Sequence, residues 1–260
     1  MKLKIILIVL IFPLLVAGKP GFNTYFNTKA LRFDFLLGGD AENVTVYPQQ
    51  IKQEPHWSGS RKNLISPFNY GTYRFRLFDT ETNTLIFSKG FSTLFQEWQT
   101  TAEAKQTHKT FYQATIFPFP KKKVKLKIDA RQWEGNFKTI FTTEIDPENY
   151  FILKEKPIEH ETKVILENGK PDKKVDIAIL AEGYKKSEMD KFFKDAKRVS
   201  GYLFEAEPFK SEKKNFNVRA VFSASVDSGT DIPGENIYRN TAFNSTFYTF
   251  DVPRYLTTSD

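Results

Sequence analysis

The sequence predicts two domains, an N-terminal antiparallel β-sandwich followed by an incomplete α/β domain. Three observations lead to this prediction. Apolar and polar residues alternate with a period of two through much of residues 30–145, as in half-buried strands. Residues 175–199 then change abruptly from a strand pattern to a helical one. Only one strand–helix–strand unit fits before Asp260, and one such unit cannot cover both faces of its own sheet.

The sandwich is predicted over residues 19–155. Leu31, Phe33 and Phe35 alternate with polar residues, and Gly, Pro, Asn and Asp clusters mark turns between the alternating segments. Seven or eight short strands with no helical pattern between them are typical of an antiparallel sandwich. The predicted strands are 31–35, 43–47, 73–77, 84–91, 110–117, 124–130 and 137–145.

A charged connector, 156–174, separates this block from the second domain, 175–260. It contains Asn168-Gly169, a strong signal for a two-residue hairpin. Residues 175–180 should form a strand buried on both faces except at Asp176. Residues 187–190 resemble a capping box, and an apolar stripe behind them predicts a helix from Glu188 to Leu203. The next strand is predicted over 216–222, and residues 223–260 should form loops and turns.

The first 18 residues have the organisation of a cleaved signal peptide. Lys2 and Lys4 precede an apolar run from Ile5 to Val16, and Val16-Ala17-Gly18 supplies small residues for cleavage. A run this short does not span a membrane. The sequence therefore predicts a secreted, periplasmic or cell-surface protein. It has no cysteine, so its stability must come from hydrophobic cores, for which 26 Phe and 11 Tyr are available.

Nucleic-acid binding is not expected, although the formal net charge is +7. The densest basic segment, 121–127, alternates with apolar residues from Lys123 onward, as on the solvent face of a half-buried strand.

No sequence motif marks a catalytic or metal site. His-Glu-x-x-His, nucleophile-elbow and phosphate-loop motifs are all absent, and His56, His108 and His160 lie far apart without a second ligand at helical spacing. We therefore expect no catalytic, cofactor-binding or metal-binding residue in this chain. Glu182 and Gly183 follow a strand and precede a helix, where open α/β sheets bind ligands, but a lone glycine is a weak signal.

The three tryptophans suggest a second class of function, the binding of sugars. Trp57, Trp98 and Trp133 could form a sugar-stacking platform on the sandwich, although side chains of this size more often fill cores.

A combination of motifs resembles a known family. In the first half these are Trp57-Ser58-Gly59, Gly71-Thr72-Tyr73, the segment 85–91 and Glu97-Trp98-Gln99-Thr100-Thr101. In the second half they are 175–184 (VDIAILAEGY), Glu207-Pro208-Phe209, 228–234 (SGTDIPG), Asn240-Thr241-Ala242, 247–250 and 254–258. Together they resemble the exported zinc metallopeptidases of the IgA-peptidase family, common in Bacteroides-like gut bacteria.

The resemblance implies an N-terminal β-domain ahead of a metzincin-like catalytic domain. It also implies zinc in the full-length enzyme, held by a His-Glu-x-x-His helix that residues 1–260 do not contain. The expected function is thus the front part of a secreted zinc endopeptidase, inactive alone, with a protein or peptide substrate, host glycoproteins among the candidates. The 228–234 loop either contributes to the substrate cleft or only forms a turn. The alternative function is a non-catalytic secreted module that binds glycan or protein.

Overall fold

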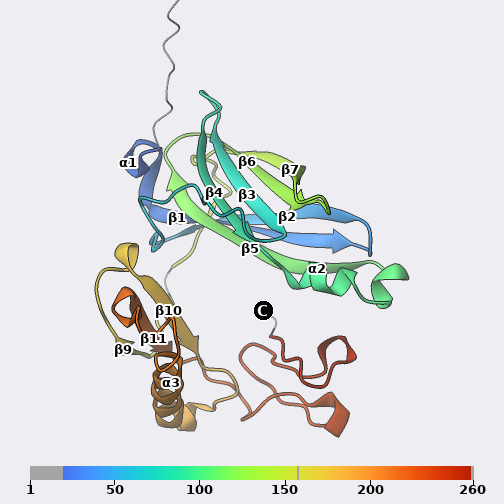
Figure 1. The fold of residues 1–260 in the computed structure, drawn as a ribbon, viewed down its shortest axis with the longest axis vertical. Coiled ribbons are helices and arrows are strands. Elements are labelled where there is room, and N and C mark those ends of the chain that lie inside the picture. Colours follow the sequence, from blue (N-terminus) through green and yellow to red (C-terminus); the bar gives the residue numbers. More distant parts are fainter. Residues whose placement is uncertain (1–19, 157, 259–260) are drawn as a thin grey trace, which may run out of the picture.

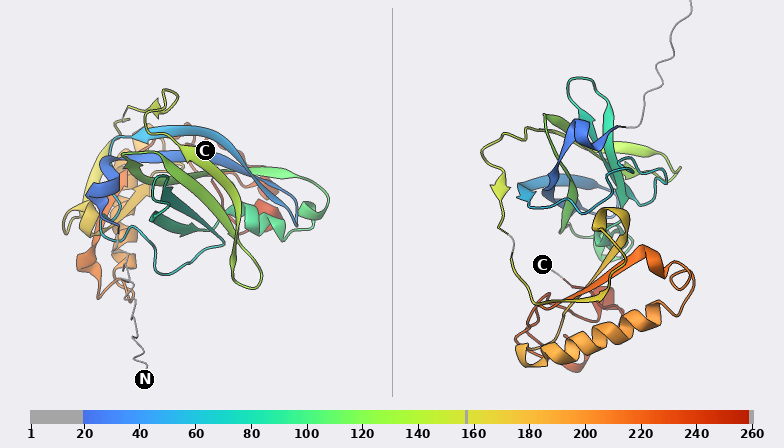
Figure 2. Two further views of the ribbon diagram at one scale, coloured as in Figure 1. Left: turned by 90° about the horizontal axis from the view of Figure 1, so that it is seen from above. Right: turned by 90° about the vertical axis from the view of Figure 1, so that its left-hand side faces the viewer.

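A computed structural model describes residues 20–156 and 158–258 of the chain, so the predicted signal peptide, 1–18, lies outside the described residues. The chain forms two lobes, a β-rich N-terminal lobe and a second lobe that contains the one long helix (Figure 1). Figure 2 shows the connector running along one side of the molecule between them. No helix in the described part of the chain is long and apolar enough to cross a membrane.

The N-terminal lobe contains two four-stranded sheets, with strand orders β5-β1-β2-β8 and β4-β3-β6-β7. All pairs are antiparallel except the short parallel contact of β8 with β2. The predicted mostly β N-terminal domain is therefore confirmed. The strands are β1 (Phe26–Gly39), β2 (Val44–Glu54), β3 (Tyr73–Asp79), β4 (Leu85–Phe91), β5 (Lys109–Pro120), β6 (Val124–Arg131), β7 (Phe137–Ile145) and β8 (Leu153–Lys154).

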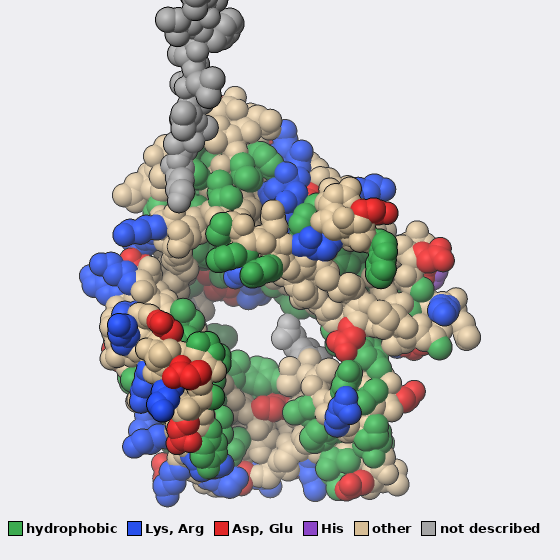
Figure 3. Space-filling model, viewed as in Figure 1, with side chains coloured by type: hydrophobic (Ala, Val, Ile, Leu, Met, Phe, Trp, Pro, Cys, Tyr) green, Lys and Arg blue, Asp and Glu red, His purple; other side chains and the backbone are tan. Residues whose placement is uncertain are grey.

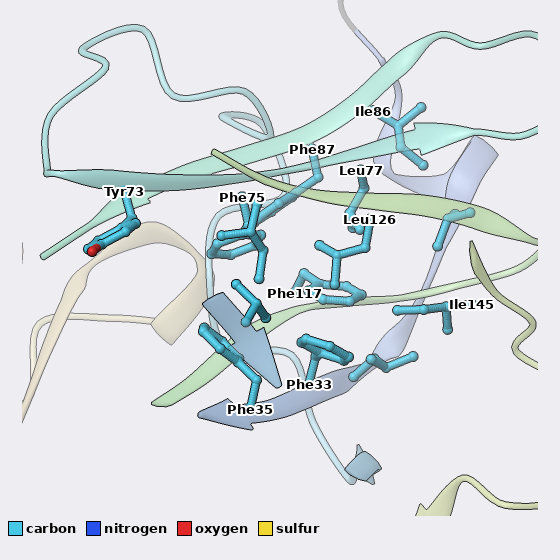
Figure 4. Close-up of a cluster of buried hydrophobic side chains, with 14 of the residues drawn as sticks. Phe33, Phe35, Tyr73, Phe75, Leu77, Ile86, Phe87, Phe117, Leu126 and Ile145 are labelled. Carbon is cyan, nitrogen blue, oxygen red and sulfur yellow. The ribbon is translucent and has the colours of Figure 1, made fainter. Parts of the chain in front are cut away.

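An aromatic core lies between these two sheets (Figure 4). The alternation seen in the sequence points Phe33 and Phe35 of β1 toward Phe75 of β3 and Phe117 of β5. Phe75 and Phe87 stack with ring centroids 5.8 Å apart. Burial of apolar surface on this scale is the main stabilising contribution to a lobe that has no disulfide. Phe250, from the second lobe, also packs against this cluster.

One buried carboxylate stabilises the outer side of the second sheet. Asp129 of β6 is fully buried and accepts hydrogen bonds from Arg74 Nε at 2.7 Å, Arg76 Nη2 at 2.9 Å and Thr139 Oγ1 at 2.7 Å. Burial opposes ionisation, but the hydrogen bonds from Arg76, Arg74 and Thr139 outweigh it and lower the pKa of Asp129. The carboxylate therefore links neighbouring strands β3, β6 and β7.

The expectation that no helix interrupts the strands was wrong. Helix α2 (Leu94–Gln99) lies between β4 and β5, and its N-cap Thr93 accepts a hydrogen bond from Gln96 N at 3.4 Å. Six residues are too few to show a helical period, although Phe95 and Trp98 are buried one turn apart. The short helices α1 (Phe22–Tyr25) and η1 (Glu103–Lys105) also belong to this lobe.

The second lobe contains a three-stranded sheet in the order β10-β11-β9. Strand β10 (Val175–Leu180), helix α3 (Met189–Leu203) and strand β11 (Phe216–Val221) form the predicted strand–helix–strand unit, in which β10 and β11 are parallel. Phe192 and Ala196 of α3 pack on Ala220 and Phe222, covering one face of the sheet. The other elements are β9 (Thr162–Leu166) and the short helices η2 (Pro171–Lys173), η3 (Lys186–Glu188), η4 (Lys213–Asn215), η5 (Pro233–Glu235) and η6 (Thr249–Asp251).

Two local predictions in the second lobe, a hairpin and a capping box, were wrong about which residues pair with each other. Asn168-Gly169 does not close a hairpin, because β9 pairs with β11 rather than with β10. The turn instead binds Asn217, which accepts from Asn168 N at 2.8 Å and donates to Gly169 O at 2.9 Å. The capping interaction lies at Lys185, whose N–H donates to Glu188 Oε2 at 2.9 Å, not at residues 187–190.

Strand β10 is not buried on both faces, which corrects a third prediction. It lies at the edge of the sheet, and α3 covers only one face. Val175 is 54% exposed and Leu180 52% exposed. On the uncovered face Leu180 neighbours Val221, and Val164 of β9 lies opposite Arg219, so apolar side chains remain open to solvent there.

Truncating the core should be far more costly than truncating an exposed aromatic side chain. Phe75→Ala should destabilise the chain by about 3–5 kcal/mol, since it removes ring contacts with Phe87, Phe91 and Phe117 and leaves a cavity. The matched control, Phe68→Ala, removes a ring that is 65% exposed. It should cost less than about 1 kcal/mol. Urea unfolding measures both, and equal losses would contradict the described core.

Replacing Asp129 should give a pH-dependent loss of stability. Because its pKa is lowered in the fold, its contribution is present above the unfolded value of about 3.9 and is lost as pH falls through the folded value. Asp129→Asn should cost roughly 2–3 kcal/mol at neutral pH. This difference should shrink in strong acid. Glu81→Gln, which removes an exposed pair with Lys122, is the control and should change little at any pH. A pH-independent loss would refute the assignment.

Candidate functional site at the carboxyl ends of two parallel strands

A cleft of about 660 Å³ lies where β10 and β11 end. Its walls come from segments far apart in the sequence: the residues after β10, the 228–230 loop and the C-terminal loops. This is the edge of a parallel sheet at which ligands commonly bind. The lining residues are Glu182, Gly183, Tyr184, Lys191, Ser228, Gly229, Thr230, Ser245, Phe247, Leu256 and Thr258.

Glu182, weighed from the sequence as a ligand-binding residue, holds a loop instead. Its carboxylate accepts hydrogen bonds from Phe243 N at 2.9 Å and from Ser245 N at 3.1 Å. Burial opposes ionisation, but hydrogen bonds from the Thr241 and Ser245 side chains and these two amides together lower the pKa of Glu182. The carboxylate thus stays ionised and fixes residues 241–245 as one wall of the cleft.

Two glycines form a tight backbone crossing in the cleft. Gly183 has φ of +70° and Gly229 has φ of +97°, a region that glycine adopts without strain. Gly229 N donates to Gly183 O at 3.0 Å. A Cβ atom on Gly183 would lie 2.2 Å from Gly229 O, so no larger residue fits. The fold therefore brings together Gly183 and the 228–234 loop, which the sequence analysis had considered separately.

Ser225 connects the ends of three segments. Its Oγ accepts hydrogen bonds from Gly183 N and Ala242 N, both at 3.0 Å, and its N–H donates to Tyr184 O at 2.8 Å. Sequence reasoning missed this residue, because a serine in a polar loop carries no distinguishing pattern. Asp227 acts similarly, since its carboxylate accepts from Asn240 N at 2.9 Å.

The helix side of the cleft carries charged contacts. Glu188, at the start of α3, accepts hydrogen bonds from Ser228 Oγ and Lys185 N, which lower its pKa. Tyr184 donates its hydroxyl proton to Asp195 Oδ2 at 3.1 Å, and Lys191 Nζ lies 4.8 Å from the centre of the Tyr184 ring. These contacts lock the 228 loop and Tyr184 against α3.

The described part of the cleft contains no cluster of metal-ligating side chains. Among residues 20–156 and 158–258, no three His, Cys, Asp or Glu side chains lie close enough together to hold a metal ion. The histidines are not gathered at the cleft: His56 and His160 are exposed, and His108 is 3.2 Å from Asp40 in the N-terminal lobe. The residues present therefore do not fit a catalytic zinc site.

The three tryptophans do not make a shared platform. Trp98 is fully buried and donates to Glu103 Oε2 at 2.8 Å, while Trp57 packs edge-on against Phe87 with centroids 5.8 Å apart. The core-filling interpretation is confirmed for Trp98. It was wrong for Trp133, which lies in the turn after β6 and is 100% exposed.

Family comparisons agree with this division of the chain. The model of the peptidase M64 N-terminus matches residues 21–142, and that of IgA peptidase M64 matches residues 164–260. A search of curated proteins found no match. The chain thus combines a β-domain with a peptidase-family segment that contains the cleft. It carries the peptidase M64 N-terminal domain and part of the IgA peptidase M64 domain, and so belongs to the IgA peptidase M64 family.

Removing the charge of Glu182 should loosen the cleft wall. In Glu182→Gln an amide NH₂ replaces one acceptor oxygen opposite a backbone N–H, so residues 241–247 should exchange amide hydrogens at least about tenfold faster, and stability should fall by about 1–3 kcal/mol. Hydrogen exchange with mass spectrometry measures this locally. Glu205→Gln, at an exposed position beyond α3, is the control. Unchanged exchange in 241–247 would show that the carboxylate does not hold the loop.

Proposed function

We propose that this chain is the front part of a secreted zinc-dependent endopeptidase. The proposal rests on the two family matches, the N-terminal domain followed by the peptidase domain. The residues that line the cleft all lie in the second match. In this proposal residues 164–260 are the first portion of a metzincin-like domain. Peptidase family membership implies a protein substrate and, in the full enzyme, zinc.

The zinc ligands are proposed to come from sequence that follows Asp260. Zinc in such an enzyme lowers the pKa of a bound water molecule so that it can attack a peptide carbonyl. The described residues contribute the cleft around Gly183 and Gly229 and the uncovered face of the β10-β11-β9 sheet. Figure 3 shows hydrophobic side chains on the second lobe beside the opening between the lobes. We propose that the missing segment covers part of this apolar surface, as a second layer must.

Secretion is part of the same proposal. It is supported by the signal-like pattern of residues 1–18. The range of substrates is proposed only as proteins or peptides, including glycoproteins.

The test uses the coding sequence extended beyond Asp260. The longer product should cleave casein, lose that activity to a zinc chelator and regain it with added zinc. The 260-residue chain alone should cleave nothing. A longer product that binds zinc yet cleaves no protein, or cleaves it equally well when stripped of metal, would refute the proposal.

Within this chain, Gly183→Ala should impair the longer enzyme. The added methyl collides with Gly229 O and forces a strained φ, so we expect at least about a tenfold loss of kcat/KM. Gly201→Ala is the matched control: Gly201 lies in α3, where a Cβ meets nothing within 4 Å. That variant should keep full activity with equal or higher stability. Equal activity in both variants would show that the crossing does not shape the substrate site.

A further inference from the structure

The outer face of the first sheet presents two tyrosines in one cross-strand row. Leu36 of β1 is paired with Tyr47 of β2 on one side and with Tyr112 of β5 on the other. Tyr47 is 48% exposed and Tyr112 41% exposed, in a lobe where most aromatic rings are buried. Because neighbouring strands lie about 4.8 Å apart, the two tyrosines are separated by roughly 10 Å across the sheet.

Gly38 allows the ring of Tyr47 to lie over the sheet. A Cβ atom on Gly38 would come within 2.9 Å of Tyr47 Cε2 and within 2.9 Å of Thr110 Cγ2. Gly38 does not have a positive φ, so its backbone conformation does not require glycine. Glycine is needed at this position because the Tyr47 ring and the Thr110 methyl group occupy the space above the strand. The ring therefore presents a face to solvent. Ala114 and Ile116, which is 38% exposed, extend this apolar strip along β5.

Beside the tyrosine row runs a polar row whose charged groups are paired with one another. Asp34 accepts hydrogen bonds from Arg32 Nε at 2.8 Å and Gln50 Nε2 at 3.0 Å. Arg32 also pairs with Glu54 at 3.2 Å, and Lys52 pairs with Glu155. The face thus offers donors and acceptors held in fixed positions, with three carboxylates against two cations.

These features together suit a sugar chain better than a protein or a polyanion. Tyrosine gives rigid, amphipathic contact area at a low entropy cost. A separation near 10 Å is comparable to the two-residue repeat of an extended β-linked glycan, so the two tyrosines suit alternate sugar rings. The apolar strip is far smaller than the 20–30 residues per partner that stable protein interfaces use. The paired charges beside the strip, which include one more carboxylate than cation, give no attraction for a phosphate or sulfate polymer.

We propose that the outer face of the β5-β1-β2 sheet binds an extended neutral glycan, with Tyr47 and Tyr112 stacking on sugar rings and with Arg32 and Gln50, both held by the buried Asp34, bonding to hydroxyl groups. Figure 1 shows this sheet as the layer of the N-terminal lobe nearer the second lobe. A glycan held here lies on the side of the N-terminal lobe nearer the second lobe. The proposal concerns the N-terminal lobe alone and does not depend on peptidase activity.

Titration calorimetry of the whole chain with N-acetylchitohexaose and with cellohexaose tests the proposal. At least one hexasaccharide should bind, and its monosaccharide should not. Tyr47→Ala and Tyr112→Ala should each weaken binding by about tenfold. Gly38→Ala should weaken it similarly by displacing the Tyr47 ring. Trp133→Ala removes a fully exposed aromatic ring from another part of the lobe and should leave affinity unchanged.

Thermal melting of each variant shows whether the fold survives, and Tyr47→Phe keeps the ring if Tyr47→Ala does not fold. Mucin, before and after enzymatic removal of its glycans, distinguishes sugar from protein recognition. Failure to bind either hexasaccharide or glycosylated mucin would overturn the proposal. So would binding that the tyrosine variants leave unchanged, or equal binding to deglycosylated mucin.

Discussion

The carboxylate of Glu182 is the interaction on which the second lobe's cleft depends. It lies directly after the edge strand and accepts the backbone N–H groups of residues 243 and 245, which are some sixty positions away in the chain. Without an acceptor there, a loop of polar residues has little apolar surface to hold it in place. Ser225 adds to the same constraint, because it bonds to both Gly183 and Ala242. The cleft is thus shaped by polar contacts, while packing by α3 supports it from behind.

The N-terminal lobe is stabilised in a different way. Its two sheets enclose stacked and edge-on phenylalanine rings, and Asp129 is a buried charge that joins three strands of one sheet through Arg74, Arg76 and Thr139. Large aromatic side chains supply the apolar area that this core buries, in a lobe without cysteine. The outer sheet faces can therefore differ from each other. The β5-β1-β2 face places two exposed tyrosines in register on either side of Leu36, beside a paired polar row.

The sequence predicted most strands, because alternation of apolar residues follows directly from one buried face. It predicted α3 for the same reason. Contacts between residues far apart in the sequence were harder to predict. Asn168-Gly169 has the local chemistry of a hairpin turn, yet Asn217 of β11 binds that turn, and β9 pairs with β11 and not with β10. The exposure of β10 was also missed, since its apolar residues look the same whether or not a second layer covers them. Glu182 was singled out by its position as a weak candidate for ligand binding, and only its hydrogen-bond partners show that it fixes a loop.

The distribution of tryptophan gives this chain a built-in optical reporter. All three tryptophans belong to the N-terminal lobe, and the second lobe has only tyrosine and phenylalanine chromophores. The indole of Trp98 lies in an apolar interior, whereas that of Trp133 is surrounded by solvent. Emission excited at the red edge of the absorption band therefore follows the N-terminal lobe alone, and a blue-shifted component from Trp98 disappears when that lobe opens. Far-ultraviolet dichroism of α3 follows the other lobe, so the two transitions are separable in one sample without any label.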